Sequence, residues 1–154
     1  MNEYDSQISI NSGFCNDRDT SSTWTSTGRN IYYGAYIRRN GTPTFKCNNI
    51  NDLYQTKIGL ITADEVMYAR GKSDTSNYGY YLYTGDYYWT ISPYGHTNLS
   101  ACLVYQVRNA GELSAGGSDN IHFSYGVRPV INLKADVTIS SGNGTASNPF
   151  VIAT

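Results

Sequence analysis

The residues of this chain that could carry out nucleophilic or general-base chemistry are few. Its two histidines, His96 and His122, both lie among polar residues typical of loops. One of its three cysteines, Cys102, lies in the apolar run ACLVYQV, which predicts a strand. A thiol in apolar surroundings stays protonated and packs as a small hydrophobic group, so it is a poor nucleophile. We therefore do not expect a catalytic cysteine–histidine pair.

Signatures of metal and nucleotide sites are also missing from the sequence. It has no HExxH, GxxxxGK or GxSxG motif, and its cysteines form no CxxC pair. Asp17, Asp19, Asp86 and Asp119 lie in turn-forming stretches without the spacing of a calcium loop. We expect no catalytic residue, no metal and no cofactor, which favours a binding protein over an enzyme.

The other two cysteines, Cys15 and Cys47, lie in the polar stretches GFCND and FKCNN. Exposed thiols in such loops suit a disulfide in an oxidising compartment, where it would close a loop of about 30 residues. Two free thiols in a reduced protein are the alternative. The sequence therefore predicts either an extracytoplasmic protein with a Cys15–Cys47 bridge or a reduced protein without it.

Tyrosine dominates the composition and indicates recognition more than catalysis. The chain has 15 tyrosines among 154 residues, and many of its aromatic residues gather between Tyr78 and Tyr94. Aromatic side chains with a polar tip make large contacts at a low cost in side-chain entropy. The alternative is that these rings pair across strands in a small β-rich core. We expect a mixture, in which one face belongs to the core and the other face binds.

Net charge and chain length argue against a nucleic-acid partner and in favour of a single domain. The net charge is −1 and the 11 lysine and arginine residues are scattered, so the chain lacks the basic stripe of a nucleic-acid-binding protein. No apolar run approaches the roughly 20 residues of a membrane span. A chain of 154 residues fits one domain with a sizeable core, and we expect residues 1–154 to form a single domain.

Turn-forming and strand-forming residues predict an α+β fold in which strands dominate. One short helix is expected over 62–70, where Thr62 and Glu65 match a capping box. A hairpin is expected around the turn at 84–86, and Pro129 predicts an edge position or a bulge in the last main strand. The expected strands cover residues 8–10, 31–37, 57–61, 81–83, 87–92, 101–107, 112–113 and 126–133, with a short one at the end of the chain.

Several longer segments together carry a family resemblance: FCNDR (14–18), TFKCNN (44–49), KIGLITADEV (57–66), YYLYTGDYYWTISPY (80–94) and the stretch 126–152. These segments resemble a group of bacterial surface proteins found mainly in gut Firmicutes. The group is similar to type IV pilin-like proteins that have a prepilin-type N-terminal helix and a C-terminal C-type lectin-like domain. Within that domain, WxxSP at Trp89–Pro93 and GVRPV at Gly126–Val130 resemble the formylglycine-generating-enzyme branch of the fold.

This resemblance implies a C-type lectin-like fold, an extracellular or cell-surface location and an apolar N-terminal helix that is missing here. The location agrees with a bridge between Cys15 and Cys47. Formylglycine-generating enzymes use cysteine chemistry in their active site, and this chain offers only Cys102 in the corresponding half. That departure favours a ligand-binding domain over such an enzyme. A purely structural pilus subunit, which would assemble with other subunits through the missing helix, is the other alternative.

C-type lectin-like domains of this kind also resemble the variable proteins of diversity-generating retroelements. Randomised adenines in AAY codons cannot produce Met, Trp, Gln, Lys or Glu, and residues 94–105 and 114–125 contain none of these five. Loops rich in glycine and serine usually lack them as well. The resemblance therefore implies a variable binding surface within about residues 88–133.

Within this region, loops and one sheet face should carry the ligand contacts. Tyrosine and phenylalanine rings would anchor an exposed protein or glycan ligand, and His, Asn, Asp and Arg would orient it. Arg128 lies within an apolar strand pattern and is expected as a buried structural group. The expected core residues are Val104, Val107, Val127, Val130, Ile131 and Leu133. The expected ligand contacts are Tyr94, His96, Thr97, Asn98, Tyr105, Arg108, Ser118, Asp119, His122, Phe123 and Tyr125.

Overall fold

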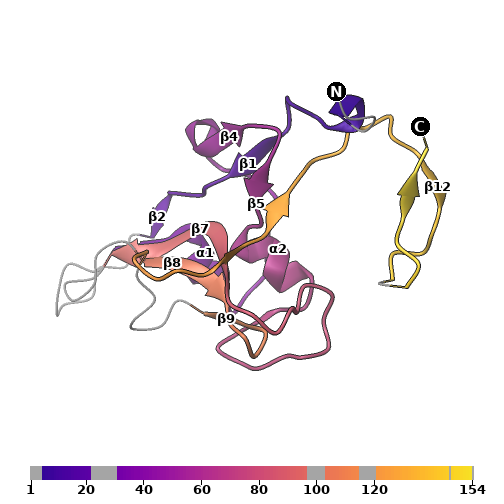
Figure 1. Cartoon of the computed structure of the whole chain (residues 1–154). Coiled ribbons are helices and arrows are strands. Elements are labelled where there is room, and N and C mark those ends of the chain that lie inside the picture. The colour runs from indigo at the N-terminus through magenta and orange to yellow at the C-terminus, as the bar shows by residue number, and fades with distance from the viewer. Residues whose placement is uncertain (1–4, 22–30, 97–102, 115–120, 146, 154) are drawn as a thin grey trace.

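The fold is dominated by β-strands and has only short helices. A computed structural model of the chain describes residues 5–21, 31–96, 103–114, 121–145 and 147–153. In these residues the helices are α1 (Gly34–Arg38), α2 (Ala63–Tyr68) and the 3-10 turns η1 (Asp5–Gln7) and η2 (Ile50–Asp52). The predicted β-rich α+β class is confirmed at this coarse level (Figure 1).

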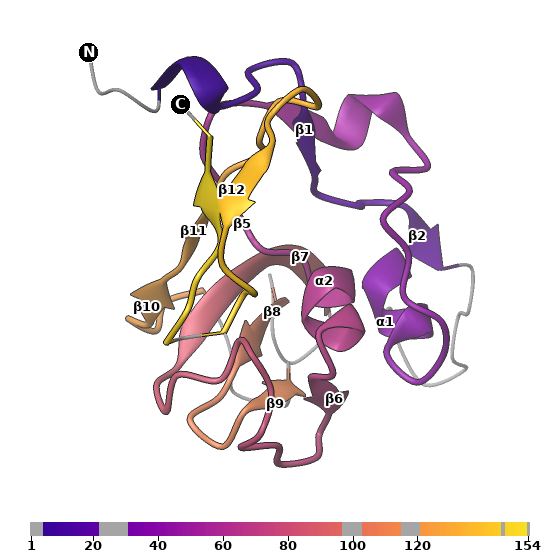
Figure 2. The ribbon, with the colours of Figure 1, turned by 90° about the vertical axis from the view of Figure 1, so that its right-hand side faces the viewer.

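One curled sheet forms the body of the molecule, and three small strand pairs flank it (Figures 1 and 2). The sheet runs in the order β2 (Thr20–Ser21), β3 (Ile31–Tyr33), β7 (Tyr88–His96), β8 (Leu103–Val107), β9 (Glu112–Ser114) and β6 (Lys72–Ser73), and β10 (Gly126–Val127) also pairs with β7. The small pairs are β1 (Gly13–Cys15) with β4 (Leu53–Gln55), β5 (Gly59–Leu60) with β11 (Pro129–Val130), and β12 (Ile139–Ser141) with β13 (Val151–Ile152).

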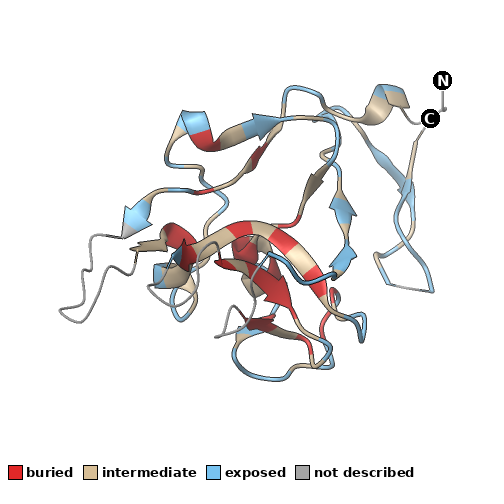
Figure 3. Cartoon of the chain, turned by 60° about the vertical axis from the view of Figure 1, so that its left-hand side comes forward, coloured by how far each residue is buried: buried red, intermediate tan, exposed pale blue. Residues whose placement is uncertain are grey.

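Strand β7 shows why the two faces of the sheet differ. Its residues Tyr88, Thr90 and Ser92 are buried, whereas the alternating Trp89 and Ile91 are only partly covered (Figure 3). Successive side chains of a strand point to opposite faces, so one face of β7 builds the core, while Trp89 and Ile91 on the other face are half-buried. The core on the buried face consists of Ala35, Ile61, Ala63, Val66, Tyr80, Leu82, Tyr88, Tyr105, Val107 and Leu113.

Helix α2 begins at the predicted capping box and is fixed to β7. The Thr62 hydroxyl accepts a hydrogen bond from the Glu65 amide at 3.0 Å, and the Glu65 carboxylate accepts one from the Thr62 amide at 2.7 Å. The Ala63 amide donates to the Ser92 hydroxyl of β7 at 2.9 Å. A helix this short needs tertiary support, and the complete burial of Ala63 and Val66 supplies it.

The predicted strand over residues 31–37 is wrong beyond Tyr33, where the chain turns into α1. This turn stacks Tyr36 of α1 on Tyr32 of β3, with ring centroids 4.0 Å apart. A Cβ on Gly34 would lie 2.7 Å from the Asp17 carboxylate, so the close approach of these two segments requires glycine. Because Ala35 is fully buried and α1 lies next to α2, tertiary packing outweighs the local preference that predicted a strand (Figure 2).

The predicted hairpin around residues 84–86 is also wrong, since no strand forms over 81–83. Tyr80 and Leu82 are only 7% exposed each and belong to the core, but the backbone around them is a series of turns. The Tyr88 hydroxyl donates to the Leu82 carbonyl at 3.0 Å. Strand β7 instead pairs with β8, which follows it after residues 97–102, and with β3, which lies much earlier in the sequence.

The segment over 126–133 is not one strand, because it breaks at Arg128 into β10 and β11. Strand β10 runs parallel to β7 and β11 runs antiparallel to β5, which agrees with the irregularity predicted from Pro129. Arg128 is half-buried, donates to the Leu82 carbonyl at 2.8 Å and lies over the Tyr88 ring, so its structural role is confirmed.

The predicted core was only partly right. Val107 is fully buried, and Val104 and Val130 are half-buried. Val127, Ile131 and Leu133 are 67%, 45% and 45% exposed, so placing them in the core was wrong. Val127 lies in β10, and Ile131 and Leu133 follow β11, in a stretch whose side chains face solvent. An apolar run in the sequence does not show which of its residues will be buried.

The Cys15–Cys47 disulfide is present and ties β1 to the loop that precedes η2. The two Cα atoms lie 5.5 Å apart across a sequence separation of 32 residues. The structure therefore confirms the predicted bridge between Cys15 and Cys47. Cys15 itself lies in β1 rather than in the expected loop, and it pairs there with Leu53 of β4.

Removing this bridge should lower the free energy of unfolding by about 3–4 kcal/mol on the chain-entropy model, since the unfolded chain would regain the freedom of a closed loop. We expect a Cys15→Ser/Cys47→Ser variant to unfold at correspondingly lower urea concentration, without a change in far-ultraviolet circular dichroism. Non-reducing peptide mapping of the wild-type protein should find Cys15 linked to Cys47. Recovery of both as free thiols after expression in an oxidising compartment would contradict this assignment.

Candidate functional site

The predicted ligand contacts do not form one group in the structure. His122, Phe123 and Tyr125 lie together on the accessible side of the sheet, whereas Tyr94 and Tyr105 lie in a separate inner cluster. Four predicted contacts, Thr97, Asn98, Ser118 and Asp119, lie outside the described residues, and so does Cys102.

A continuous series of aromatic rings crosses the face of the sheet opposite the core. We call it the outer aromatic column, and it consists of Tyr87, Trp89, His122, Phe123 and Tyr125. Tyr125 is its central ring, with centroids 5.0 Å from Tyr87, 4.8 Å from Trp89 and 5.8 Å from Phe123. His122 continues the series 4.5 Å from Phe123. Phe123 is 39% exposed and His122 is exposed, so the end of the column reaches solvent.

The parallel pairing of β10 with β7 brings the column together. Gly126 lies opposite Tyr88 and its amide donates to the Tyr87 carbonyl at 2.9 Å. A Cβ on Gly126 would lie 3.0 Å from that carbonyl, so glycine allows the two backbones to approach closely. Tyr125 is thereby set beside Tyr87 and Trp89, which sequence reasoning had not included among the contacts. The aromatic character of Tyr87 and Trp89 was a signal of a binding role. Their partner Tyr125 lies some 40 positions away, just before a strand whose pairing with β7 the sequence does not reveal.

The inner aromatic cluster consists of Tyr32, Tyr36, Tyr94 and Tyr105. Tyr94 meets Tyr32, Tyr36 and Tyr105 edge to face, with centroid distances of 5.5, 5.2 and 5.3 Å. Tyr105 is fully buried, so the prediction that it contacts a ligand is wrong. The strand pattern around it places Tyr105 on the core face of β8, together with Val107.

Burial governs the ionisation of these inner hydroxyls. Burial, followed by the neighbouring Tyr32 and Tyr36, raises the pKa of Tyr94 to about 12. Burial also raises the pKa of Tyr105. Arg39 places its guanidinium 3.7 Å from the centre of the Tyr36 ring, a cation–π contact at the rim of the cluster. The Tyr94 and Tyr105 hydroxyls are thus neutral at ordinary pH.

The two remaining predicted contacts have different surroundings. Arg108 is half-buried and pairs with Glu112 at 2.9 Å across the turn between β8 and β9. His96 is exposed at the end of β7, opposite Ile31 of β3. His96 therefore lies at the inner-cluster end of β7, while His122 lies in the outer aromatic column.

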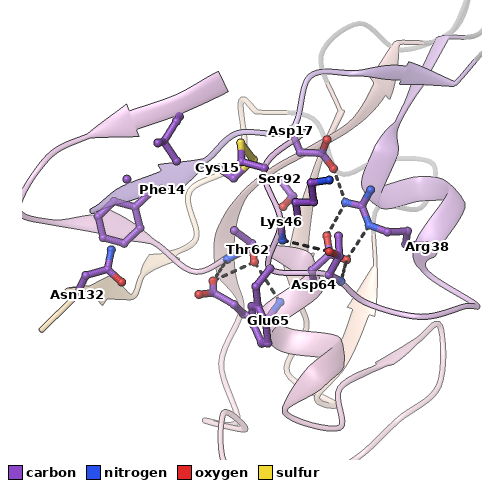
Figure 4. A pocket seen from close by; sticks show the side chains of 15 residues that line it. Phe14, Cys15, Asp17, Arg38, Lys46, Thr62, Asp64, Glu65, Ser92 and Asn132 are labelled. Carbon is purple, nitrogen blue, oxygen red and sulfur yellow. Dashed lines mark hydrogen bonds and ion pairs between the residues drawn. A yellow bond between two sulfur atoms is a disulfide. The ribbon is translucent and has the colours of Figure 1, made fainter. Parts of the chain in front are cut away.

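A cavity of about 250 Å³ lies beside the disulfide, between β1, α1 and α2 (Figure 4). Arg38 crosses it and pairs with both Asp17 and Asp64. The Asp64 carboxylate accepts from Arg38 Nε at 2.8 Å, from Arg38 Nη2 at 2.6 Å and from the Thr44 amide at 3.0 Å. Hydrogen bonding to Asp64 and to Asp17 raises the pKa of the Arg38 guanidinium against the opposing effect of burial.

Most of the polar side chains that line this cavity already pair with one another. Glu65 is engaged in the helix cap and the Ser92 hydroxyl accepts from Ala63, while Arg38 joins Asp17 to Asp64. A binding pocket usually presents a few convergent polar groups that lack partners. We therefore interpret the cavity as the charged centre of the fold, and the outer aromatic column as the candidate functional site.

Two further findings concern the described part of the chain. There, no group of three His, Cys, Asp or Glu residues is arranged to hold a metal ion. None of its helices has the length and apolar character needed to cross a membrane. Comparisons with known proteins add nothing to this picture, because no family model, no curated protein and no solved structure matches the chain.

Replacing Arg38 by methionine should destabilise the protein by about 3–5 kcal/mol, because it leaves two buried carboxylates without their cation. Lys57→Met is the matched control, since it removes a cation from an exposed pair with Asp5 whose side chains are 48% and 38% accessible. We expect that control to cost less than about 1 kcal/mol. Urea unfolding followed by tryptophan fluorescence measures both. Equal effects of the two substitutions would show that the Arg38 pairs are not structural.

Stability should decline at alkaline pH because of the buried tyrosines. The pKa of Tyr94 is about 12 in the folded protein and lies above its ordinary value of 10.0, so the stabilisation is complete below pH 10.0 and is lost as the pH rises through about 12. We expect the free energy of unfolding to fall across this window and Tyr94→Phe to make the fall less steep. Urea titrations at several pH values between these limits measure the slope. A slope unchanged in Tyr94→Phe would contradict the assigned burial of the hydroxyl.

Proposed function

We propose that this chain is a ligand-binding domain and that the outer aromatic column forms part of its recognition surface. The observation that carries the proposal is a series of five rings on the sheet face opposite the core, each in contact with at least one other and ending in the exposed Phe123 and His122. Rings that already hold one another lose little conformational freedom when a partner binds. Aromatic residues fixed in this way are typical anchors of recognition surfaces.

The division of the sheet into two faces supports this role. Tyr88 and Val107 hold the core from one face, while Trp89 contributes to the column from the other. Binding groups on a rigid scaffold can change without disturbing the core beneath them. This arrangement is compatible with the variable surface that the sequence resemblance implies for about residues 88–133.

The fuller proposal is a C-type lectin-like domain, displayed by a pilin-like bacterial surface protein and diversified by a retroelement. It assigns the protein an extracellular location, an exposed protein or glycan as ligand, and no catalytic activity. The support is the sequence resemblance, the β-rich fold with short helices, and the Cys15–Cys47 disulfide, which suits an oxidising compartment.

A structural pilus subunit is the second candidate, and one observation favours it. Tyr105 is fully buried and Tyr94 half-buried, so part of the predicted contact set serves packing instead. A subunit whose surface only assembles with its neighbours needs no free aromatic column. The exposure of Phe123 and His122 therefore favours ligand binding over this alternative.

Screening the protein against a printed glycan array and a phage-displayed peptide library would test the function. We expect a saturable ligand whose affinity falls at least tenfold in Phe123→Ala, because an anchor ring is lost. Tyr81→Ala is the matched control, since Tyr81 is 76% exposed and makes no ring contact with the column. Binding that both substitutions leave unchanged would remove the column from the recognition surface.

A further inference from the structure

The rings of the outer aromatic column turn their flat faces toward one another. The planes of Tyr87 and Tyr125 meet at 20°, and those of Phe123 and Tyr125 meet at 16°. His122 follows on Phe123 with its ring tilted by 35° and the centroids 4.5 Å apart. Phe123, which is 39% exposed, therefore has ring neighbours on both Tyr125 and His122. A face that stacks on a neighbour is closed to a ligand, so the column offers mainly ring edges.

The edge and the face of an aromatic ring attract different chemical groups. The face carries negative charge density and the edge carries positive charge density. A sugar stacks on a ring through C–H groups that carry a partial positive charge, so it needs a free ring face. The edge of Phe123 suits an aliphatic side chain or the face of an aromatic one, in an edge-to-face contact. The orientation of the rings thus favours a protein ligand over a glycan.

Aliphatic side chains extend the surface beside the column. Val127 of β10 lies opposite Trp89 in the parallel register, so its side chain lies on the sheet face of the column, and it is 67% exposed. In the described residues β10 pairs only with β7 and lies beside it at the edge of the sheet (Figure 2). Ile121, which precedes His122, is 61% exposed. Val127 and Ile121 add apolar area but no hydrogen-bonding group for the hydroxyls of a sugar.

The segments that build this surface carry no charge. Residues 87–92 and 121–127 contain no aspartate, glutamate, lysine or arginine. Arg128, the next residue, donates to the Leu82 carbonyl and lies over the Tyr88 ring of the core. The centres of protein–protein interfaces are likewise rich in aromatic residues and poor in charged ones. A charged partner surface would lose its hydration here without gaining an ion pair, so an uncharged one fits better.

We propose that the outer aromatic column binds a different protein through uncharged aromatic or aliphatic side chains of that protein, and does not bind a glycan. This inference rests on the proposed function and narrows its ligand class. The partner's side chains pack on the edge of Phe123 and over Val127 and Ile121. A second copy of this chain is a poor occupant, because a two-fold contact would set the positive ring edges of one copy against those of the other.

Peptides selected from a phage-displayed library on the wild-type protein serve as probes. Val127→Thr places a hydroxyl in the apolar surface, and Val151→Thr is the matched control, because Val151 is 50% exposed but lies in β13. Both substitutions keep a β-branched residue, so the strands are retained. We expect Val127→Thr to weaken peptide binding about fivefold, because apolar contact area is lost, and Val151→Thr to leave it unchanged. Near-ultraviolet circular dichroism checks that the core of each variant is intact.

Isothermal titration calorimetry measures the dissociation constant of each selected peptide. Binding of the peptides should show a negative heat-capacity change, because apolar surface is buried. The affinity should change little between about 50 and 500 mM sodium chloride, because no ion pair forms. A strong salt dependence, or equal losses of affinity in Val127→Thr and Val151→Thr, would contradict the assigned contact.

Three further outcomes would overturn the inference. One is a glycan from a printed array whose binding is lost in Phe123→Ala and unchanged in Val127→Thr; the proposed function would then stand with another ligand class. The second is self-association of the wild type in sedimentation velocity that Phe123→Ala abolishes, since the occupant would then be a second copy. The third is a library that yields no peptide dependent on Phe123. Only if no ligand of any class depends on Phe123 does the proposed function fail as well.

Discussion

The ion pairs of Arg38 are the constraint on which the rest of the arrangement depends. Asp17 follows β1 and the disulfide, Arg38 ends α1, and Asp64 lies in the first turn of α2. A guanidinium can be buried only if its charge and its donors are satisfied together. Three segments distant in the sequence must therefore meet at one point. The hydrogen bond from the Ala63 amide to the Ser92 hydroxyl then fixes α2 to strand β7 of the sheet.

The aromatic residues of β7 have two roles, because some belong to the core and others to the outer aromatic column. Residues on its core face, such as Tyr88, pack beneath α2, whereas Trp89 joins rings supplied by the segment that precedes β10. The same residue type is thus structural or accessible according to the face on which it falls. Tyr94 lies past a register irregularity between Pro93 and Gly95 and belongs to the inner cluster instead. Composition alone cannot make this division.

The cavity beside the disulfide, the outer aromatic column and the C-terminal hairpin of β12 and β13 are held in place by different contacts. The cavity beside the disulfide is held by charges that satisfy one another, so it acts as a rigid centre. The outer aromatic column rests on the best-paired strands of the sheet. The C-terminal hairpin has few contacts with the body and leaves its own edge open.

The sequence by itself determined what depends on short-range interactions. The capping box at Thr62 and Glu65, the strands around 103–107 and 112–114, and the irregularity at Pro129 all follow from neighbouring residues. The sequence left open whether Cys15 and Cys47 form a disulfide or remain free thiols, and the structure shows the disulfide. Tertiary structure alone decided that residues 34–38 form a helix, that Tyr105 is buried and that Tyr125 lies between Tyr87 and Phe123. These outcomes depend on burial and on pairing between distant strands, and such energies are set by partners that no local pattern identifies.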